Sequence, residues 1–255
     1  MTRDFVGEGE QTVIYELERM KRKTLSIHLE DDGRVVVKSP YGIKNSEIRA
    51  LVGKKAQWIL EKQALLKKQA SQRIVHRFAQ GEKFLFLGHM YNLHMNYHSG
   101  LDKICVSTKD DCLIVETPVV DTEQIEAAIL LWYKENALRL MLQRVDDYGP
   151  QVGARPEKVM IRQQKRRWGS CNSRGELRLN WKLIMAPLPV LDYVVVHELC
   201  HLPHMDHSAL FWADVGRVFP DYKTCRQWLK TYGHLLEWHT IQNTSLAGQR
   251  KDEDE

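Results

Sequence analysis

The chain has 255 residues, of which 43% are hydrophobic and 27% are charged. This is an ordinary composition for a soluble globular protein, and the length suffices for one large domain or two small ones. The formal net charge of +4 is mild, so it permits an acidic partner such as nucleic acid but requires none. The five cysteines are odd in number, and the first ten residues lack the apolar stretch of a signal peptide. The sequence therefore predicts a cytoplasmic protein, and no apolar run predicts a membrane span.

The first half of the chain is predicted to be rich in β-strands. Strands are expected at residues 12–17, 24–28 and 35–38. From residue 45 to about 69 the apolar spacing becomes helical, with Asn45 or Ser46 as the cap. A second β-rich stretch has candidate strands at residues 84–86, 91–93, 104–106 and 113–115. The two β-rich stretches are candidates for one mixed sheet.

The second half combines long helices with short strands. A helix is predicted from 121 to about 147, with Asp121 and Gln124 as a capping box. Strands are expected at residues 158–161, 167–171 and 176–181, and helices at residues 190–201, 208–218 and from 220 onward. The predicted fold class is α+β. Its predicted parts are a β-rich region with one helix (1–118), a catalytic core (119–240) and a disordered tail (241–255).

The chemistry is predicted to reside in the pattern HExxH, formed by His197, Glu198 and His201. Residues four apart share one face of a helix, so both imidazoles can point at one zinc ion. Glu198 projects beside the metal, where it can accept a proton from a zinc-bound water. Because the preceding run is almost entirely apolar, histidines placed there without a metal or dedicated partners would be costly to bury. The pattern therefore predicts a metal site, the alternative being histidines satisfied by hydrogen bonds.

A catalytic zinc usually has three protein ligands, and two further histidines follow closely. His204 would lie on the ligand face only if the helix continued, and the resulting straight row would converge badly on one tetrahedral ion. Pro203 opposes continuation of the helix. The sequence therefore favours His207, folding back after a bend, as the third ligand. The interval from His201 to His207 also occurs in metzincins, but the glycine of their pattern is absent here.

Four segments carry a family resemblance: Trp168-Gly-Ser-Cys171, Glu176-Leu-Arg-Leu-Asn-Trp181, Tyr193-Val-Val-Val-His-Glu-Leu-Cys-His201 and His207-Ser-Ala-Leu-Phe-Trp212. In this order they resemble the YgjP-like metal-dependent hydrolase family, related to SprT- and WLM-type zincins. The resemblance covers about residues 12–235. It implies a minimal zincin-like core after the β-rich portion, with one Zn²⁺ ion held by His197, His201 and His207. It also implies that Glu198 is the catalytic acid and base.

Other residues are candidates for supporting roles. Asp206 stands where related sequences often carry a small polar residue, and it is expected to cap the helix beginning at Ser208. The strand 176–181 is a candidate for pairing with an extended substrate, the alternative being an ordinary core-flanking strand. Phe211 and Trp212 are expected to pack behind the site, and Ser170 and Cys171 to serve a turn or packing. A basic cluster at Arg162, Lys165, Arg166 and Arg167 is usually a solvated face but could approach the cleft. The candidate substrate-binding residues are Arg166, Arg167, Trp168, Glu176 and Asn180.

The favoured interpretation is a zinc-dependent metallopeptidase acting on a peptide or protein. Tyr222 and His204 are possible stabilisers of the oxyanion. The first alternative is a zinc-dependent hydrolase of nucleoside triphosphates on the same site, although no glycine-rich phosphate loop supports it. The second is a binding protein that keeps zinc for structure, which leaves the intact Glu198 without a purpose.

Overall fold

The computed structural model describes residues 2–30, 32–164 and 167–240. Its contacts divide the chain into two compact units, residues 1–73 (unit 1) and residues 74–255 (unit 2). The two units meet between residues 73 and 74, whereas the predicted β-rich region and catalytic core meet between residues 118 and 119. The predicted boundary concerns function and stays a prediction. The predicted tail 241–255 lies outside the described residues. The described residues form five α-helices and four small sheets, which confirms a mixed α+β fold.

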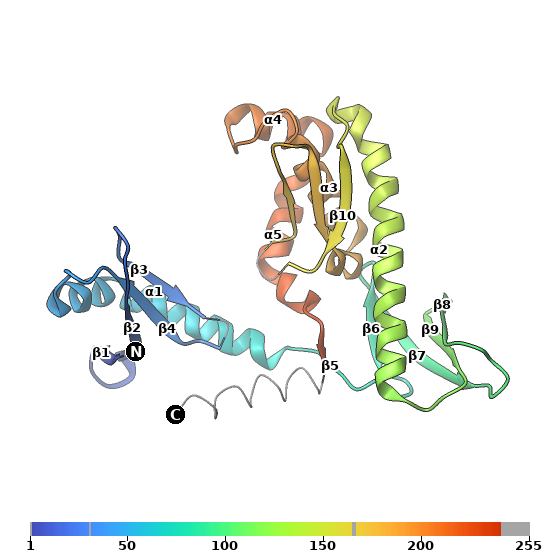
Figure 1. The fold of residues 1–255 in the computed structure, drawn as a ribbon, viewed down its shortest axis with the longest axis horizontal. Coiled ribbons are helices and arrows are strands. Elements are labelled where there is room, and N and C mark those ends of the chain that lie inside the picture. Colours follow the sequence, from blue (N-terminus) through green and yellow to red (C-terminus); the bar gives the residue numbers. More distant parts are fainter. Residues whose placement is uncertain (1, 31, 165–166, 241–255) are drawn as a thin grey trace. The chain divides into compact units, whose positions relative to one another are not determined.

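Unit 1 is a four-stranded sheet with one helix against it (Figure 1). The strands are β1 (Thr2–Val6), β2 (Val13–Arg19), β3 (Ser26–Leu29) and β4 (Val35–Ser39), in the order β1-β2-β4-β3. The short 3-10 helix η1 (Gly9–Gln11) joins β1 to β2, and α1 spans Asn45–Ser71. The three predicted strands and the helix are confirmed, whereas β1 was not predicted.

The predicted cap of α1 is wrong. Lys44 occupies the N-cap position, and Asn45 and Ser46 lie inside the helix. The amide oxygen of Asn45 accepts a hydrogen bond from the Arg19 guanidinium at 2.6 Å and so does not serve the helix. Alternate strand residues pack under α1 and form a separate small core, which consists of Val13, Tyr15, Leu17, Val35, Val37, Ile48, Val52 and Ile59.

Unit 2 begins with the short strand β5 (Val75–His76) and a second four-stranded sheet. That sheet contains β6 (Lys83–Phe86), β7 (His89–Tyr97), β8 (Cys105–Lys109) and β9 (Cys112–Thr117), in the order β6-β7-β9-β8. The four predicted strands are confirmed. The expectation of one mixed sheet is wrong, because the strands of unit 1 pair only among themselves and each sheet has its own core.

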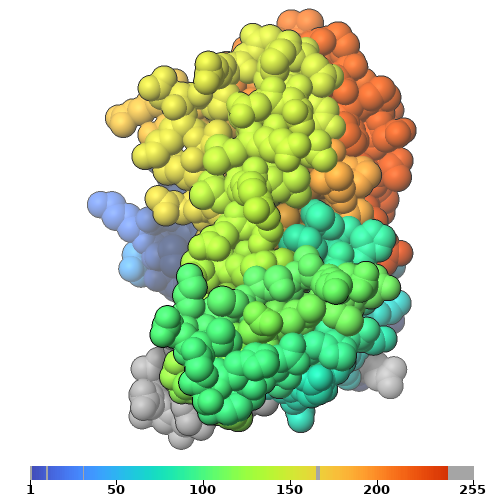
Figure 2. Space-filling view, turned by 90° about the vertical axis from the view of Figure 1, so that its right-hand side faces the viewer, coloured from blue at the N-terminus to red at the C-terminus, as the bar shows by residue number. Residues whose placement is uncertain are grey.

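Helix α2 (Thr122–Val152) runs along unit 2 and links this sheet to the C-terminal elements (Figure 2). The Asp121 carboxylate accepts hydrogen bonds from the backbone of Glu123 and Gln124, as predicted for the cap. The Gln124 side chain donates to that carboxylate at 2.9 Å and does not reach back to the backbone. The buried hydroxyl of Tyr133 donates to the carbonyl of Leu85 at 2.8 Å and so joins α2 to β6.

The C-terminal elements surround a buried helix. A three-stranded sheet, in the order β10-β12-β11, consists of β10 (Lys158–Arg162), β11 (Gly169–Cys171) and β12 (Glu176–Asn180). The helical elements that follow are η2 (Trp181–Met185), α3 (Leu188–Cys200), α4 (Ala209–Val218), α5 (Tyr222–Tyr232) and η3 (Gly233–Leu236). The last strand, β13 (His239–Thr240), pairs in parallel with β5, so the first and last strands of unit 2 are neighbours. Helix α3 contacts α2, α4, α5 and β11.

Candidate metal centre

The buried position of α3 follows from its sequence. Every residue from Val190 to Val196 is buried, and the acid among them, Asp192, is compensated by Arg144 at 3.1 Å and by the Tyr148 hydroxyl at 3.2 Å. The helix places His197 and Glu198 in its last turn, and His201 is its C-cap. The chain then turns at Pro203 before α4 begins. The predicted end of the helix near Pro203 is therefore confirmed.

The bend brings a third imidazole beside the first two. The ring centres of His197, His201 and His207 lie 5.0, 5.1 and 4.8 Å apart in pairs. One candidate ligand atom from each ring lies within 4.8 Å of the others. The Nε2 atoms of His197 and His207 are 3.2 Å apart. Two nitrogens bound to one tetrahedral zinc at 2.0–2.1 Å would be separated by about 3.3 Å, so the geometry fits a shared ion.

His204 lies elsewhere and serves the site through its backbone. Its Nε2 pairs with the Asp214 carboxylate at 2.8 Å. Its carbonyl accepts a hydrogen bond from Nδ1 of His201 at 3.0 Å. Because a carbonyl only accepts, His201 carries its proton on Nδ1 and leaves Nε2 free to bind a metal. His204 therefore orients one of the three imidazoles.

Two aromatic side chains of α4 pack against the cluster. Phe211 is fully buried, and its ring centre lies 5.0, 4.6 and 4.9 Å from those of the three histidines His197, His201 and His207. Trp212 stacks on His207, at 5.7 Å between ring centres and 24° between planes. Both residues pack against the histidines, as predicted. Ser208 caps α4 through its own side chain, so the predicted cap at Asp206 is wrong; Asp206 accepts a hydrogen bond from the Ser208 backbone at 3.2 Å.

The surroundings hold the imidazoles in the form that binds metals. Burial lowers the pKa of His197 to about 3, and the neighbouring histidines and Arg226 act in the same direction. Burial also lowers the pKa of His201. These imidazoles are therefore neutral at ordinary pH, and a neutral ring nitrogen can act as a ligand.

Glu198 is buried beside β11. The residue is 5% exposed, and within the part of the chain that the structure describes its Oε2 atom has no hydrogen-bond partner. Burial raises the pKa of Glu198 to about 8, and the charge of Arg167 opposes this rise. A buried carboxyl oxygen without a partner is unfavourable, and a nearby cation with its bound water would satisfy it. The donor set and this oxygen together fit a bound metal ion.

Gly169 provides the space that Glu198 occupies. A Cβ atom at this position would lie 2.6 Å from both Cγ and Oε1 of Glu198. Any side chain would therefore displace the carboxylate. The Trp168-Gly-Ser-Cys171 segment was identified from the sequence, but no sequence pattern showed that its glycine packs against a residue 29 positions later.

The residues predicted to bind substrate differ in their burial and in their contacts. Arg166 lies outside the described residues, whereas Arg167 is exposed and its charge acts on Glu198. Trp168 is partly buried against Gly233. Glu176 accepts hydrogen bonds from Asn172 and Arg178 within the hairpin. Their substrate contacts stay predictions.

Asn180 is buried and bonded to the backbone on three sides. It donates to the carbonyls of Gln164 and Arg167 at 2.9 and 3.1 Å and accepts from the amide of Lys182. These bonds fix the segment that leads into β11. They favour a supporting role for Asn180, and its contact with substrate stays a prediction.

The strand expected to pair with substrate has no free edge. β12, which covers most of the predicted 176–181, pairs with β10 on one side and with β11 on the other. Of the two roles considered for this strand, pairing with a substrate is therefore wrong, and its two partners agree with an ordinary core-flanking strand. The strand that lies both at the edge of this sheet and beside Glu198 is β11.

Three further residues were considered for chemistry: Cys171 as a nucleophile, and His204 and Tyr222 as stabilisers of the oxyanion. Cys171 is half-buried, and burial, together with the nearby Glu198, raises the pKa of its thiol to about 11, so it is a poor nucleophile at neutral pH. His204, a possible oxyanion stabiliser, is held by Asp214. Tyr222, the other, stacks on Trp212 at 5.4 Å.

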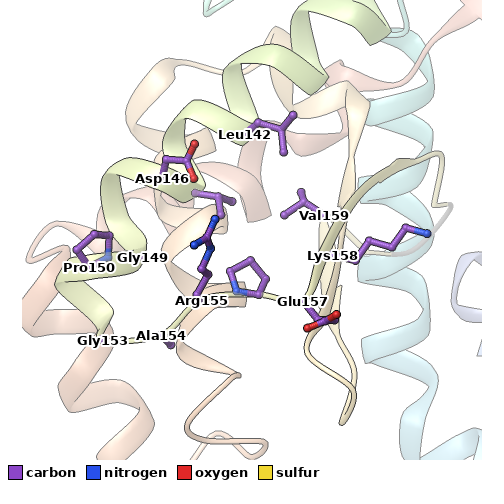
Figure 3. Close-up of a pocket in the computed structure, with 12 residues that line it drawn as sticks. Leu142, Asp146, Gly149, Pro150, Gly153, Ala154, Arg155, Glu157, Lys158 and Val159 are labelled. Atoms are coloured by element: carbon purple, nitrogen blue, oxygen red, sulfur yellow. The ribbon is translucent and has the colours of Figure 1, made fainter.

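A cavity of about 610 Å³ lies away from the histidines, between the C-terminal end of α2 and the start of β10 (Figure 3). Leu142 and Asp146 line it from α2, and Arg155 and Lys158 from the following segment. None of its lining residues belongs to the histidine cluster. The candidate ligand atoms, and not the size of a cavity, therefore indicate where the chemistry takes place.

Among the described helices, none is long and apolar enough to cross a membrane.

Comparison with known proteins agrees with the resemblance seen in the sequence. One solved structure that is similar is that of the metallopeptidase zymogen abylysin of Pyrococcus abyssi, at 22% identity and a TM-score of 0.34, with 39% of this chain and 98% of that chain covered. No curated protein matches. Residues 23–232 match a family described as YgjP-like, metallopeptidase domain. Because this match covers most of the chain, the protein belongs to the YgjP-like metallopeptidase family.

Proposed function

We propose that the protein is a zinc-dependent peptidase with one Zn²⁺ ion held by His197, His201 and His207. The observation that carries this proposal is the convergence of three imidazoles from two sides of a bend, with Nε2 atoms of His197 and His207 3.2 Å apart. Membership of a metallopeptidase family supports a metal ion and a peptide or protein substrate. Three neutral nitrogen ligands favour zinc over magnesium or calcium, which prefer oxygen.

Glu198 is the proposed general base and acid. When bound, Zn²⁺ would polarise the scissile carbonyl and lower the pKa of a water molecule. Glu198 would accept a proton from the attacking water and later deliver it to the leaving amine. Its burial strengthens any charge interaction at the site, because little water screens it. Arg167 favours the charged carboxylate that the first of these steps requires.

Among the described strands β11 pairs only with β12, and its outer edge offers a place for an extended substrate. The Asn180 amide donates to the Trp168 carbonyl, and the Asn172 amide donates to that of Glu176. In an antiparallel pair such bonded positions alternate, so Gly169 and Cys171 direct their backbone groups away from β12. A peptide could therefore add as a further strand next to Glu198.

The proposed catalytic core lies within residues 119–240, with α3 as its metal-binding helix. A zincin-like core related to SprT- and WLM-type proteins is part of this proposal, as is a cytoplasmic location. The core elements are α2 to α5 and the sheet β10-β12-β11. In support, α3 packs against α4, which follows His207, and against β11, which contains Gly169.

The decisive experiment compares wild type with Glu198→Gln after zinc loading. Casein and a set of unstructured peptides are the substrates, and metal content is measured on the same samples. Loss of a general base is expected to reduce kcat by about 10²–10⁴ while one zinc per chain is retained. Glu135→Gln, an exposed carboxylate on α2, is the matched control and should retain full activity.

Two results would overturn the proposal. Hydrolysis of nucleoside triphosphates without peptide cleavage, lost in Glu198→Gln, would show that the same groups act on phosphoanhydrides. Wild-type behaviour of Glu198→Gln in every assay, with unfolding of His197→Ala, would show that zinc is only structural.

A further inference from the structure

Two arginines, one in α5 and one in the segment before β11, lie near the candidate metal centre. Arg226 belongs to α5, and its Cζ atom lies 5.0 Å from the centre of the Trp212 ring. Trp212 in turn stacks on His207 at 5.7 Å. Arg226 and the proposed ligand His207 therefore both contact the Trp212 ring. Arg167 immediately precedes Trp168 and the strand β11 that contains Gly169.

Both arginines are exposed, and each is linked by contacts to a group of the centre. Arg226 lies over Trp212, whose ring centre is 5.7 Å from those of both His197 and His207. Arg167 lies two residues before Gly169, which packs against Glu198. The two arginines thus add positive charge near the place where a substrate would be bound.

Neither guanidinium has an acidic partner within residues 2–30, 32–164 and 167–240. The carboxylates of the bend and of α4 are already engaged. Asp206 accepts from Ser208, and Asp214 binds both His204 and Arg217. Within the described residues, the guanidinium groups of Arg226 and Arg167 are therefore available to an anionic ligand.

The aromatic wall makes Arg226 a suitable receptor. Its guanidinium lies over the Trp212 ring, and Tyr222 stacks on the same ring at 5.4 Å. A guanidinium held against an aromatic face keeps its edge free for two parallel hydrogen bonds to a carboxylate. Holding the group in place beforehand also reduces the entropy lost when a ligand binds.

We propose that Arg226, assisted by Arg167, forms a carboxylate-binding subsite beside the metal centre. The subsite selects peptide segments that carry a negative charge close to the scissile bond. This inference rests on the proposed peptidase function. The carboxylate could be an acidic side chain or the free C-terminus of a peptide, which share the same chemistry, and the experiment separates the two.

The test uses matched peptides that differ only in charge. A peptide cleaved by the wild-type enzyme is varied with Glu or Gln at each position near the cleaved bond, and with a free or amidated C-terminus. At one position Glu should raise kcat/KM by about tenfold or more over Gln, as expected for a hydrogen bond to a charged group. A preference for the free over the amidated end would assign the subsite to the C-terminus.

Variants of the arginines locate the effect. Arg226→Gln should remove most of the preference for Glu, Arg226→Lys should keep part of it, and Arg167→Gln should reduce it. Arg139→Gln, which removes an exposed charge from α2, is the matched control and should leave the preference unchanged. Added salt should weaken the preference in the wild type, because the interaction is between exposed charges.

A binding measurement keeps the inference separate from catalysis. Fluorescein-labelled decapeptides containing Glu or Gln are titrated with Glu198→Gln protein and followed by fluorescence anisotropy. Tighter binding of the Glu peptide, lost in a Glu198→Gln/Arg226→Gln double variant, would support the subsite even without turnover. Equal binding and equal cleavage of both peptides would overturn it while leaving the peptidase intact. A preference that survives removal of both arginines would also overturn it.

Discussion

Replacing Gly169 with alanine tests how closely the position of Glu198 controls the chemistry. The added methyl carbon would lie 2.6 Å from Cγ and Oε1 of Glu198, whereas ordinary contacts are 3.4–4 Å. The carboxylate must therefore move by about 1 Å. A displacement of this size at a catalytic group costs about 100-fold in rate, equivalent to roughly 2.7 kcal/mol of transition-state stabilisation.

The backbone should tolerate the change. Gly169 is not among the residues with positive φ, so alanine introduces no backbone strain of that kind. The overpacking should lower the free energy of unfolding by about 1–3 kcal/mol. We therefore expect a folded protein with one zinc per chain and kcat reduced about 100-fold.

The assay measures kcat, KM, zinc content and urea unfolding of Gly169→Ala. Gly100→Ala is the control, because a Cβ there meets nothing within 4 Å. Full activity of a folded Gly169→Ala protein would refute the idea that Glu198 needs this space. Loss of zinc along with activity would also refute it, since the change would then act on the histidines.

Three further predictions concern metal binding, stability and pH. His207→Ala should abolish stoichiometric zinc binding. His204→Ala keeps the backbone carbonyl that orients His201, so it should bind zinc and lose only about 1 kcal/mol of stability. Equal zinc binding by both variants would contradict the proposed ligand set. The Lys182 ammonium is buried against Glu237, so Glu237→Gln should lower the free energy of unfolding in urea by about 2 kcal/mol. The loss should be smaller than that for a fully buried ion pair, because Glu237 is partly exposed. Burial raises the pKa of Glu198 to about 8. The metal-free wild type should therefore lose stability relative to Glu198→Gln as the pH rises from about 5 to 8. Parallel curves of stability against pH for the two proteins would show that the carboxyl is not buried as described.

Local patterns in the sequence predicted much of the helical structure and the histidine cluster. The helical spacing of apolar residues identified most of α1 and α2, and HExxH followed by Pro203 indicated a bend that returns His207. These features depend on residues close together in the chain. Conformation over one or two turns is determined locally, so a sequence pattern can reveal it.

Features that depend on distant residues were missed. Gly169 and Glu198 are brought together by packing between β11 and α3, and Arg226 reaches the site from α5. The order β10-β12-β11 decides which strand keeps a free edge, and no periodicity within a strand encodes that order. The two-residue strands β5 and β13 are too short to produce a pattern at all.

The parallel pairing of β5 with β13 has a practical consequence for dissecting the protein. A fragment that starts at Ile74 retains both strands, together with the packing of the His76 ring against Phe84 and Trp238, at 4.3 and 4.7 Å between ring centres. A fragment that starts at residue 119 would lose β5 to β9 and would expose the apolar face of α2, including Tyr133. Truncation at Ile74 therefore keeps the compact unit intact, so that the histidines can be studied without residues 1–73.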